Sequence, residues 1–281
     1  MDLAILIVCY RCELEQSRTI SGLMKHLTEA GENIVNVLIW NNGPKLWGNN
    51  INDLANNKTL NVRVVQTPEN RPLSWIYNDF IAMYSSDYYV ILDHDSEITE
   101  QFITDVQSLQ HEQLCLPIIY SKGCAINPTC NGKFNPGPYE KNQKIMSIGS
   151  GLVLSQTLVD SLHKRWASVF DERFALYGVD TTFFNRINKL KCADGIRTIS
   201  GFEHSLSRHE TESEQVQKMR LEERSIDLGL SLRHYPSLGL YWHFLKILIK
   251  KCTRKGIVNL NTVMSSFLCG AHPRTKRQRN R

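Results

Sequence analysis

Two aspartates separated by one residue carry the clearest chemistry in this sequence. Asp93 and Asp95 flank His94 directly after the apolar run YYVIL, which predicts a buried strand. In an extended chain residues i and i+2 point to the same side, so both carboxylates can face one cation while His94 faces away. Carboxylates completed by diphosphate oxygens are the ligands expected for Mg²⁺ or Mn²⁺. The same motif also fits an ordinary surface turn, because Asp favours turns after strands.

A third acidic residue, Asp180, follows Gly178 and Val179 at the start of a pattern that predicts a helix over residues 180–190. Gly178 permits a close approach of another group to the backbone. An Asp in this place is also a common helix N-cap, so a functional role for Asp180 depends on the two aspartates after the earlier strand.

The elements that must position these residues alternate along the first half of the chain. Apolar, β-branched runs predict strands, and amphipathic segments between them predict helices, which indicates an α/β fold with a doubly wound, mainly parallel sheet and helices on both faces. Residues 121–145, rich in Gly, Pro and Asn, predict a mobile flap or insertion. The predicted strands are 3–9, 34–40, 62–66, 88–92 and 114–120, and the predicted helices are 14–30, 73–84, 101–109 (capped by Thr99), 180–190 and 211–229.

Ligands of such sheets bind beyond the carboxyl ends of the strands. All four relevant strand exits in this sequence are polar, and we expect them to ring one edge of the sheet. They are Tyr10-Arg11, Asn41-Asn42, Thr67–Arg71 and Asp93-His94-Asp95.

Length and composition exclude several classes of protein. The chain has 281 residues, of which 42% are hydrophobic and 22% charged, as in a folded globular protein rather than a disordered one. The apolar run Leu3–Cys9 is far shorter than the ~20 residues of a membrane span, and no signal peptide is evident, so we expect a cytoplasmic protein with its eight cysteines as free thiols. The sequence contains no GxGxxG after the first strand, no GxxxxGK[ST] and no HExxH, which argues against NAD-type, P-loop and zincin sites.

Charge divides the chain into two parts. After Asp227 there is no acidic residue and there are eleven Lys and Arg, whereas the preceding part holds 22 basic and 28 acidic residues. We therefore predict a catalytic domain over residues 1–228 and a basic, amphipathic segment over residues 229–281, with its last eight residues disordered. A basic tail on an acidic body is not the pattern of a uniformly basic nucleic-acid binder, so no nucleic acid is expected as a partner.

The order of these motifs resembles the family 2 glycosyltransferases of the GT-A fold over roughly residues 3–210. LAILIVCYR resembles the family's first strand and its Tyr-Asn exit, with Arg11 in place of Asn, and VNVLIWNNG resembles Val-Asp-Asn-Gly, with Asn41 in place of Asp. DHD matches the family's DxD site, MSIGSGLVLS its acceptor-side segment, and GVDTTFFNR its Glu-Asp motif, with Val179 in place of Glu. LDHDSEI and FDERFALYGVDTTFFNRI are most similar to rhamnosyltransferase-like members.

The resemblance implies an inverting transferase that moves a sugar from a nucleoside diphosphate, a dTDP- or UDP-sugar, to a saccharide acceptor. Asp180 would take the proton of the attacking hydroxyl, and a Mn²⁺ or Mg²⁺ ion would neutralise the leaving diphosphate. His204 resembles a histidine that some members add as a metal ligand, although a strand-end histidine bonded to backbone explains it equally well. The implied metal ligands are Asp95 and His204, the donor-binding residues are Tyr10, Arg11, Asn42, Asn70, Arg71, Asp93 and Asp95, and the acceptor-side residues are Ser150 and Gly151.

The segment LGLYWHFLKILI, residues 238–249, predicts a helix of about 18 Å, which is too short to cross a bilayer. It fits a helix in the interface of an anionic membrane, at the inner face of the cell membrane, and it fits equally a helix packed on the catalytic domain. By analogy with the family, membrane contact would suit a lipid-linked acceptor and the synthesis of a bacterial surface polysaccharide such as O-antigen or capsule.

Three other functions are weighed against this one. A phosphatase would carry its DxD after the first strand, and a nucleotidyltransferase would carry a Gly-rich basic loop where CYRCELEQ stands. A basic-tailed nucleic-acid-binding protein is the alternative from a different class. Within the favoured class, hexosyl or galactosyl transfer is the alternative to rhamnosyl transfer.

Overall fold

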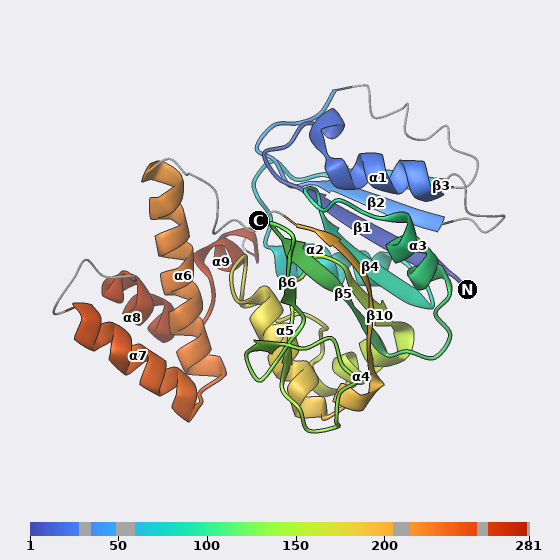
Figure 1. Ribbon diagram of the computed structural model, residues 1–281. Helices are drawn as coiled ribbons and strands as arrows, with labels where there is room; N and C mark the ends of the chain where they lie inside the picture. Colours follow the sequence, from blue (N-terminus) through green and yellow to red (C-terminus); the bar gives the residue numbers. More distant parts are fainter. Residues whose placement is uncertain (28–34, 49–59, 205–213, 252–257, 280–281) are drawn as a thin grey trace.

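The computed structural model describes residues 1–27, 35–48, 60–204, 214–251 and 258–279 (Figure 1). Its main sheet has the strand order β11-β5-β10-β4-β1-β2-β3, and β6 pairs with β5. A smaller sheet has the order β8-β7-β9. The main-sheet strands are β1 (Leu3–Cys9), β2 (Val35–Asn41), β3 (Leu60–Gln66), β4 (Tyr88–Asp93), β5 (Leu114–Ser121), β6 (Cys124–Asn127), β10 (Leu152–Ser155) and β11 (Ile196–Glu203).

The main sheet is mostly parallel, as the sequence predicts. β1 runs parallel to both β2 and β4, β3 runs parallel to β2, and β11 runs parallel to β5. β10 is antiparallel to its neighbours β4 and β5, and neither β10 nor β11 is among the strands expected from the sequence. Because β1, β2, β3 and β4 are parallel, their polar exits meet at one edge of the sheet, which confirms the expected ring.

Helices cover both faces of the sheet. Short helices η1 (Leu14–Gln16) and α1 (Arg18–Leu27), with α3 (Glu100–Gln107), pack on one face with the side chains of Leu3, Ile5 and Ile7. The other face holds α2 (Leu73–Met83), α4 (Gln156–Trp166) and α5 (Val179–Leu190), which pack with Ala4, Leu6 and Val8. β1 is buried on both faces, which explains why its sequence is an apolar run without alternation. A second 3-10 helix in the described residues is η3 (Ala193–Gly195).

Residues 121–146 contain short paired strands, which the sequence analysis did not predict, and the interpretation of residues 121–145 as a mobile flap or insertion stays a prediction. β6 folds back on β5, and β7 (Thr129–Cys130) pairs with β8 (Lys133–Phe134) and β9 (Ile145–Met146). The turns are Lys122-Gly123 and Asn131-Gly132, and all four residues have positive φ. Positive φ at both central residues of a two-residue turn matches the twist of a hairpin, and Asn-Gly is its strongest sequence signal. That signal was present in the sequence and was missed.

The C-terminal part is an all-helical unit beside the sheet, in orange and red in Figure 1. It consists of α6 (Glu214–His234), α7 (Leu238–Lys251), α8 (Leu260–Cys269) and α9 (Pro273–Arg279). Gly229, the predicted boundary between the two parts, lies inside α6, where its missing side chain lets α8 approach: a Cβ there would lie 2.1 Å from Ser266 Oγ. The division into 1–228 and 229–281 stays a prediction.

The expectations for the C-terminal residues and for the cysteines can be compared with the structure. The expected disorder after residue 273 was wrong for the part that the structure describes, because α9 is helical and Thr275 is buried. Seven cysteines in the described residues are free, as expected. Among the described residues no helix is both long enough and apolar enough to pass through a membrane.

Candidate active site

The turn after β4 is held in place by the start of α1. Thr19 receives a hydrogen bond from the Ser96 backbone N–H (2.9 Å) and donates its hydroxyl to the carbonyl oxygens of Asp93 and Ser96. Ser17 donates its hydroxyl to the carbonyl oxygen of His94 at 3.0 Å. These contacts use the main-chain groups of the turn, so the carboxylates of Asp93 and Asp95 remain available for a ligand.

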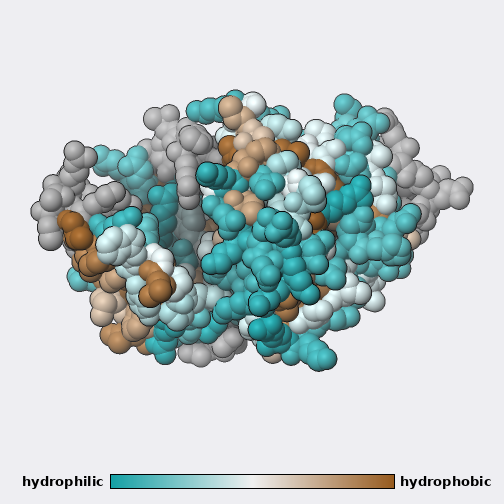
Figure 2. Space-filling view, turned by 60° about the horizontal axis from the view of Figure 1, so that its bottom comes forward, coloured by the Kyte–Doolittle hydropathy of each residue, from teal (hydrophilic) through white to brown (hydrophobic). Residues whose placement is uncertain are grey.

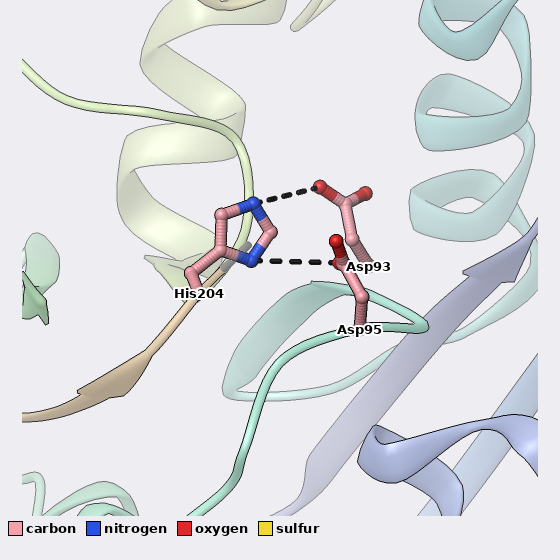
Figure 3. A group of neighbouring side chains, drawn as sticks. All are labelled: Asp93, Asp95 and His204. Atoms are coloured by element: carbon pink, nitrogen blue, oxygen red, sulfur yellow. Dashed lines mark ion pairs between the residues drawn. The ribbon is translucent and has the colours of Figure 1, made fainter. Parts of the chain in front are cut away.

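Asp93, Asp95 and His204 form one cluster (Figure 3). One potential ligand atom from each lies within 4.8 Å of the other two. His204 Nδ1 is 3.5 Å from Asp95 Oδ1, and His204 Nε2 is 4.0 Å from Asp93 Oδ2. His204 comes from the end of β11, more than 100 residues from the aspartates, so the fold makes this cluster from distant segments.

Two buried serines join the parts of this cluster. Ser96 Oγ lies 2.7 Å from Ser150 Oγ and 3.2 Å from His204 Nδ1, and the Asp93 backbone N–H donates to Ser150 Oγ at 3.0 Å. A bridge between the backbones of Ser96 and His204 holds β11 against the turn. Ser150 is 1% exposed, and its hydroxyl is used by Ser96 and by the backbone of Asp93. Ser96 was not among the expected site residues; its place directly after the DHD motif was the available signal.

The charges of the cluster fit a cation. Burial, together with the negative charge of Asp95, raises the pKa of Asp93 to about 7. Two carboxylates and an imidazole are a suitable ligand set for Mn²⁺ or Mg²⁺, which would offset that repulsion. The expected contribution of His204 to the ligand set therefore matches its position, and Asp93 joins Asp95 as a candidate ligand.

Asp180 faces the same site from α5. It is the second residue of that helix, whose N-cap is Gly178, so the alternative of a simple N-cap is excluded. Burial and the charge of Asp93 raise the pKa of Asp180 to about 7, while a backbone hydrogen bond from Gly149 and the neighbouring His204 act to lower it. A Cβ at Gly149 would lie 2.5 Å from Asp180 Oδ1, so only glycine leaves room for this carboxylate. The base candidate and the metal cluster thus act on each other across one site.

Gly151, expected on the acceptor side, has a packing role in the structure. Its φ is +87°, and its N–H donates to the carbonyl of Ile91 at 2.7 Å. A Cβ there would lie 2.3 Å from Pro117 and 2.9 Å from Phe202. Contact of Ser150 or Gly151 with an acceptor stays a prediction.

Asn42 organises the loop that follows β3. Its amide donates to Asn70 Oδ1 (3.2 Å) and to the carbonyl of Arg71 (2.9 Å), and its oxygen accepts from the Arg71 N–H (2.7 Å) and from Thr67 Oγ1 (2.9 Å). Asn42 is 1% exposed, so these contacts occupy its side chain. Asn41 is likewise used internally, by Gln66 and the backbone of Lys45. A direct contact of Asn42 with the donor stays a prediction, and its observed contacts are those of a positioning residue.

Four further donor-site candidates, Tyr10, Arg11, Asn70 and Arg71, lie at this edge. Arg71 pairs with Asp79 at 2.5 Å, lies over the Trp75 ring and keeps a buried Nε that has no hydrogen-bond partner among the described residues. Arg11 is exposed, with its guanidinium 5.3 Å from the centre of the Tyr10 ring. Arg11 and Asn70 both have positive φ, near 55°, which shows how sharply the chain turns at these strand exits.

The loop after β3 and the helix α2 that follows it are hydrogen-bonded to the segment that precedes Asp180. The N–H of Leu73, at the start of α2, donates to the carbonyl of Ala175 at 2.8 Å. Asn78 donates to the carbonyl of Phe170 at 3.0 Å and accepts from its N–H at 2.9 Å. α2 therefore connects the loop after β3 to the segment that precedes Asp180, and these contacts of Asn78 could not be read from the sequence.

The comparisons with known proteins agree with this geometry. Residues 4–148 match the family model described as Glycosyl transferase family 2, and the chain belongs to this family. No curated protein matches the chain.

Solved structures show the same fold. TarS of S. aureus superposes with a TM-score of 0.54 at 13% identity over 99% of this chain, which spans 50% of the length of TarS. The structure of TarS residues 1–349 in complex with UDP-GlcNAc gives a TM-score of 0.50 at 12% identity, covering 99% of this chain and 83% of that one. The mannosyltransferase PcManGT of Pyrobaculum calidifontis, in complex with GDP-Man and Mn²⁺, gives 0.52 at 10% identity, covering 99% and 78%. The fold is therefore GT-A-like.

Proposed function

We propose that this protein is a metal-dependent, inverting glycosyltransferase that moves a sugar from a nucleoside diphosphate to a hydroxyl of a saccharide. The observation that carries the proposal is the meeting of Asp93, Asp95 and His204 with Asp180 at the carboxyl edge of the sheet. The family match and the donor complexes of TarS and PcManGT support it.

Each side of the site has a distinct task. Asp93, Asp95 and His204 would hold Mn²⁺ or Mg²⁺, which supplies charge to neutralise the leaving diphosphate. Tyr10, Arg11, Asn70 and Arg71 stand at the neighbouring strand exits, where a nucleotide would lie. Ser150 and Ser96 hold the metal ligands in their orientation, as partners behind a metal site do.

Asp180 is the proposed base. An in-line displacement at the anomeric carbon needs one group to accept the proton of the attacking hydroxyl, and it inverts the configuration; retention by double displacement also needs a nucleophile. A pKa of about 7 suits a general base that works near neutral pH, because the carboxylate is both ionised and basic enough there.

A donor panel tests this proposal. dTDP-rhamnose, UDP-galactose, UDP-glucose, UDP-GlcNAc and GDP-mannose are incubated with the protein, Mn²⁺ and saccharide acceptors, and nucleotide release is measured with and without acceptor. We expect acceptor-dependent release from one donor, abolished by chelator and by Asp180→Asn. Nucleotide release that persists in chelator and also in the Asp180→Asn variant would contradict the proposed chemistry.

Within this function we propose rhamnosyl transfer in the assembly of a bacterial surface polysaccharide, O-antigen or capsule. The support is the likeness of LDHDSEI and the residue 170–187 segment to rhamnosyltransferase-like members. Preference for a hexosyl or galactosyl donor in the panel would replace it with the alternative.

We also propose that the C-terminal helices bind an anionic membrane at the cytoplasmic face, where a lipid-linked acceptor would lie. α7 exposes five large apolar or aromatic side chains on one face, at spacings of three and four residues, and Ile247 on its other face packs against α6 and α8. α8 adds Met264, Phe267 and Leu268, and apolar residues gather on these helices at the left of Figure 2. The exposed residues of α7 are Leu238, Tyr241, Trp242, Leu245 and Ile249.

Co-sedimentation with vesicles tests this surface. We expect the protein to pellet with vesicles that contain anionic lipid, and to a smaller extent with neutral vesicles. Trp242→Ser should reduce pelleting, whereas Met83→Ser, which changes an exposed apolar residue on α2, should not. Equal pelleting with both vesicle types, or an equal effect of both variants, would contradict the proposal.

A further inference from the structure

The last described helix, α9, lies between α6 and the sheet (Figure 1), although its sequence, PRTKRQR, is that of a solvated tail. His272 and Thr275 are buried, at 4% and 3% exposure. The His272 N–H donates to the carbonyl of Arg173 at 2.9 Å, which attaches the segment to the catalytic part of the chain. The position of α9 is therefore determined by the buried residues His272 and Thr275 and by the hydrogen bond to Arg173.

Glu223 of α6 is the centre of these contacts. Arg274 Nη2 lies 3.1 Å from both carboxylate oxygens of Glu223, and His272 Nε2 lies 3.1 Å from Oε2. The side chains of Glu223 and Arg274 are 13% and 20% exposed, so water competes little for the pair. Charge-assisted bonds to both oxygens fix the direction of the guanidinium as well as its position.

The guanidinium has a second contact, on the donor side of the site. Arg274 Nη1 donates to the carbonyl of Asn70 at 3.4 Å, across 204 positions of sequence. Asn70 is the residue with φ of +56° in the loop after β3, and its side chain accepts a hydrogen bond from Asn42. Arg274 thus contacts the backbone of the residue whose side chain binds Asn42.

We infer that Arg274 is a positioning residue of the donor site: held by Glu223, it fixes the backbone of Asn70 in the conformation that receives the nucleotide sugar. The inference rests on the proposed function for the identity of the ligand, and on the contacts of Arg274 for the mechanism. A non-glycine residue in the left-handed region persists only where its surroundings hold it, and Arg274 and Asn42 hold it from two sides. Loss of Arg274 should let the loop sample other conformations and weaken donor binding, with little effect on the chemical step.

Amide hydrogen exchange tests the mechanism without any ligand. In the full chain with Arg274→Ala, we expect the amides of Glu69, Asn70 and Arg71 to exchange about tenfold faster, while those of β1 and β4 keep their rates. Lys276→Ala removes an exposed positive charge from the same helix and should leave the loop unchanged. If Arg274→Ala does not fold, Glu223→Gln, which keeps the size of the side chain and weakens the grip on Arg274, takes its place.

Kinetics with the donor that the panel identifies supply the second readout. The donor KM of Arg274→Ala should rise about fivefold or more, with kcat within about twofold of the parent, because the interaction is present in both the bound ground state and the transition state. Unchanged exchange at Glu69, Asn70 and Arg71, faster exchange throughout the sheet, or a fall in kcat with KM constant would each overturn the inference. If no donor reacts, the proposed function fails, and the exchange experiment still decides whether Arg274 holds the loop.

Discussion

Asp180→Asn keeps the size of the side chain and removes its charge. The variant therefore loses the ability to accept a proton while the packing around residue 180 is preserved. General-base catalysis contributes about 10²–10⁴-fold, and we expect kcat to fall by such a factor, which equals ~3–5 kcal/mol of activation free energy. Burial and the charge of Asp93 raise the pKa of Asp180 to about 7 in the metal-free site, and Mn²⁺ at the cluster should lower it from there. Below the pKa of the metal-bound enzyme, kcat/KM of the parent should fall about tenfold for each pH unit, and the variant should lack this limb. Rates of transfer in Mn²⁺ between pH 5.5 and 8.5 measure both effects.

The same substitution should raise stability. A carboxyl whose pKa is higher in the folded state stabilises the fold fully below its ordinary pKa of 3.8, and this contribution is lost as the pH rises through about 7. At pH 8 without metal, Asp180→Asn should therefore raise the free energy of unfolding, by up to about 4 kcal/mol before screening on the open side of the site reduces it. Urea unfolding at pH 8 and pH 5 in chelator measures the difference.

These two results together identify the base, since a merely damaged site would lose activity and stability together. Asp194→Asn, which changes an exposed carboxylate after α5, is the matched control and should alter neither. Transfer by Asp180→Asn within tenfold of the parent rate, or a loss of stability at pH 8, would refute the reasoning.

Mn²⁺ at 100 times its Kd should stabilise the parent by about 2.7 kcal/mol, and Asp95→Asn should remove most of this stabilisation. An equal Mn²⁺-induced shift of the melting temperature in both proteins would reject the metal site. Asp171→Asn should destabilise the fold by about 3–5 kcal/mol at pH 7, because it leaves buried Arg186 and its neighbour Arg173 without their carboxylate. Hydrogen bonds and the charge of Arg173 lower the pKa of Asp171, so its contribution holds above pH 3.8 and is lost as the pH falls further. Denaturant unfolding between pH 3 and 7 measures this, and a pH-independent difference would contradict it.

The local sequence was sufficient to predict features that depend on a single strand or on the residues directly after it. The run LAILIVC predicts a strand buried on both faces because such strands need apolar residues at every position. The spacing of Asp93 and Asp95 predicts a shared side because the period of an extended chain is two. Both expectations hold, because β1 is buried on both faces and Asp93 and Asp95 meet beside His204 at the carboxyl edge of the sheet.

Other roles depend on partners that are distant in sequence. Asn42 is expected to touch the donor, yet its amide is occupied by Asn70, Arg71 and Thr67. Ser150 is expected on the acceptor side, yet it is buried against Asp93 and Ser96. The residue type gives hydrogen-bonding capacity, but only the packed loops determine which partner uses it.

By itself, then, the sequence determined the first strands and helices of the sheet, the edge at which their polar exits meet, and the acidic residues available there, because these follow from the periodicity and chemistry of short segments. Only the tertiary structure decided that His204 joins the two aspartates, that the charge of Asp93 raises the pKa of Asp180, and that the basic end of the chain folds back through Arg274 onto the loop after β3. These contacts join residues about 85 to 205 positions apart, and their geometry comes from the packing of the whole domain, which no local pattern encodes.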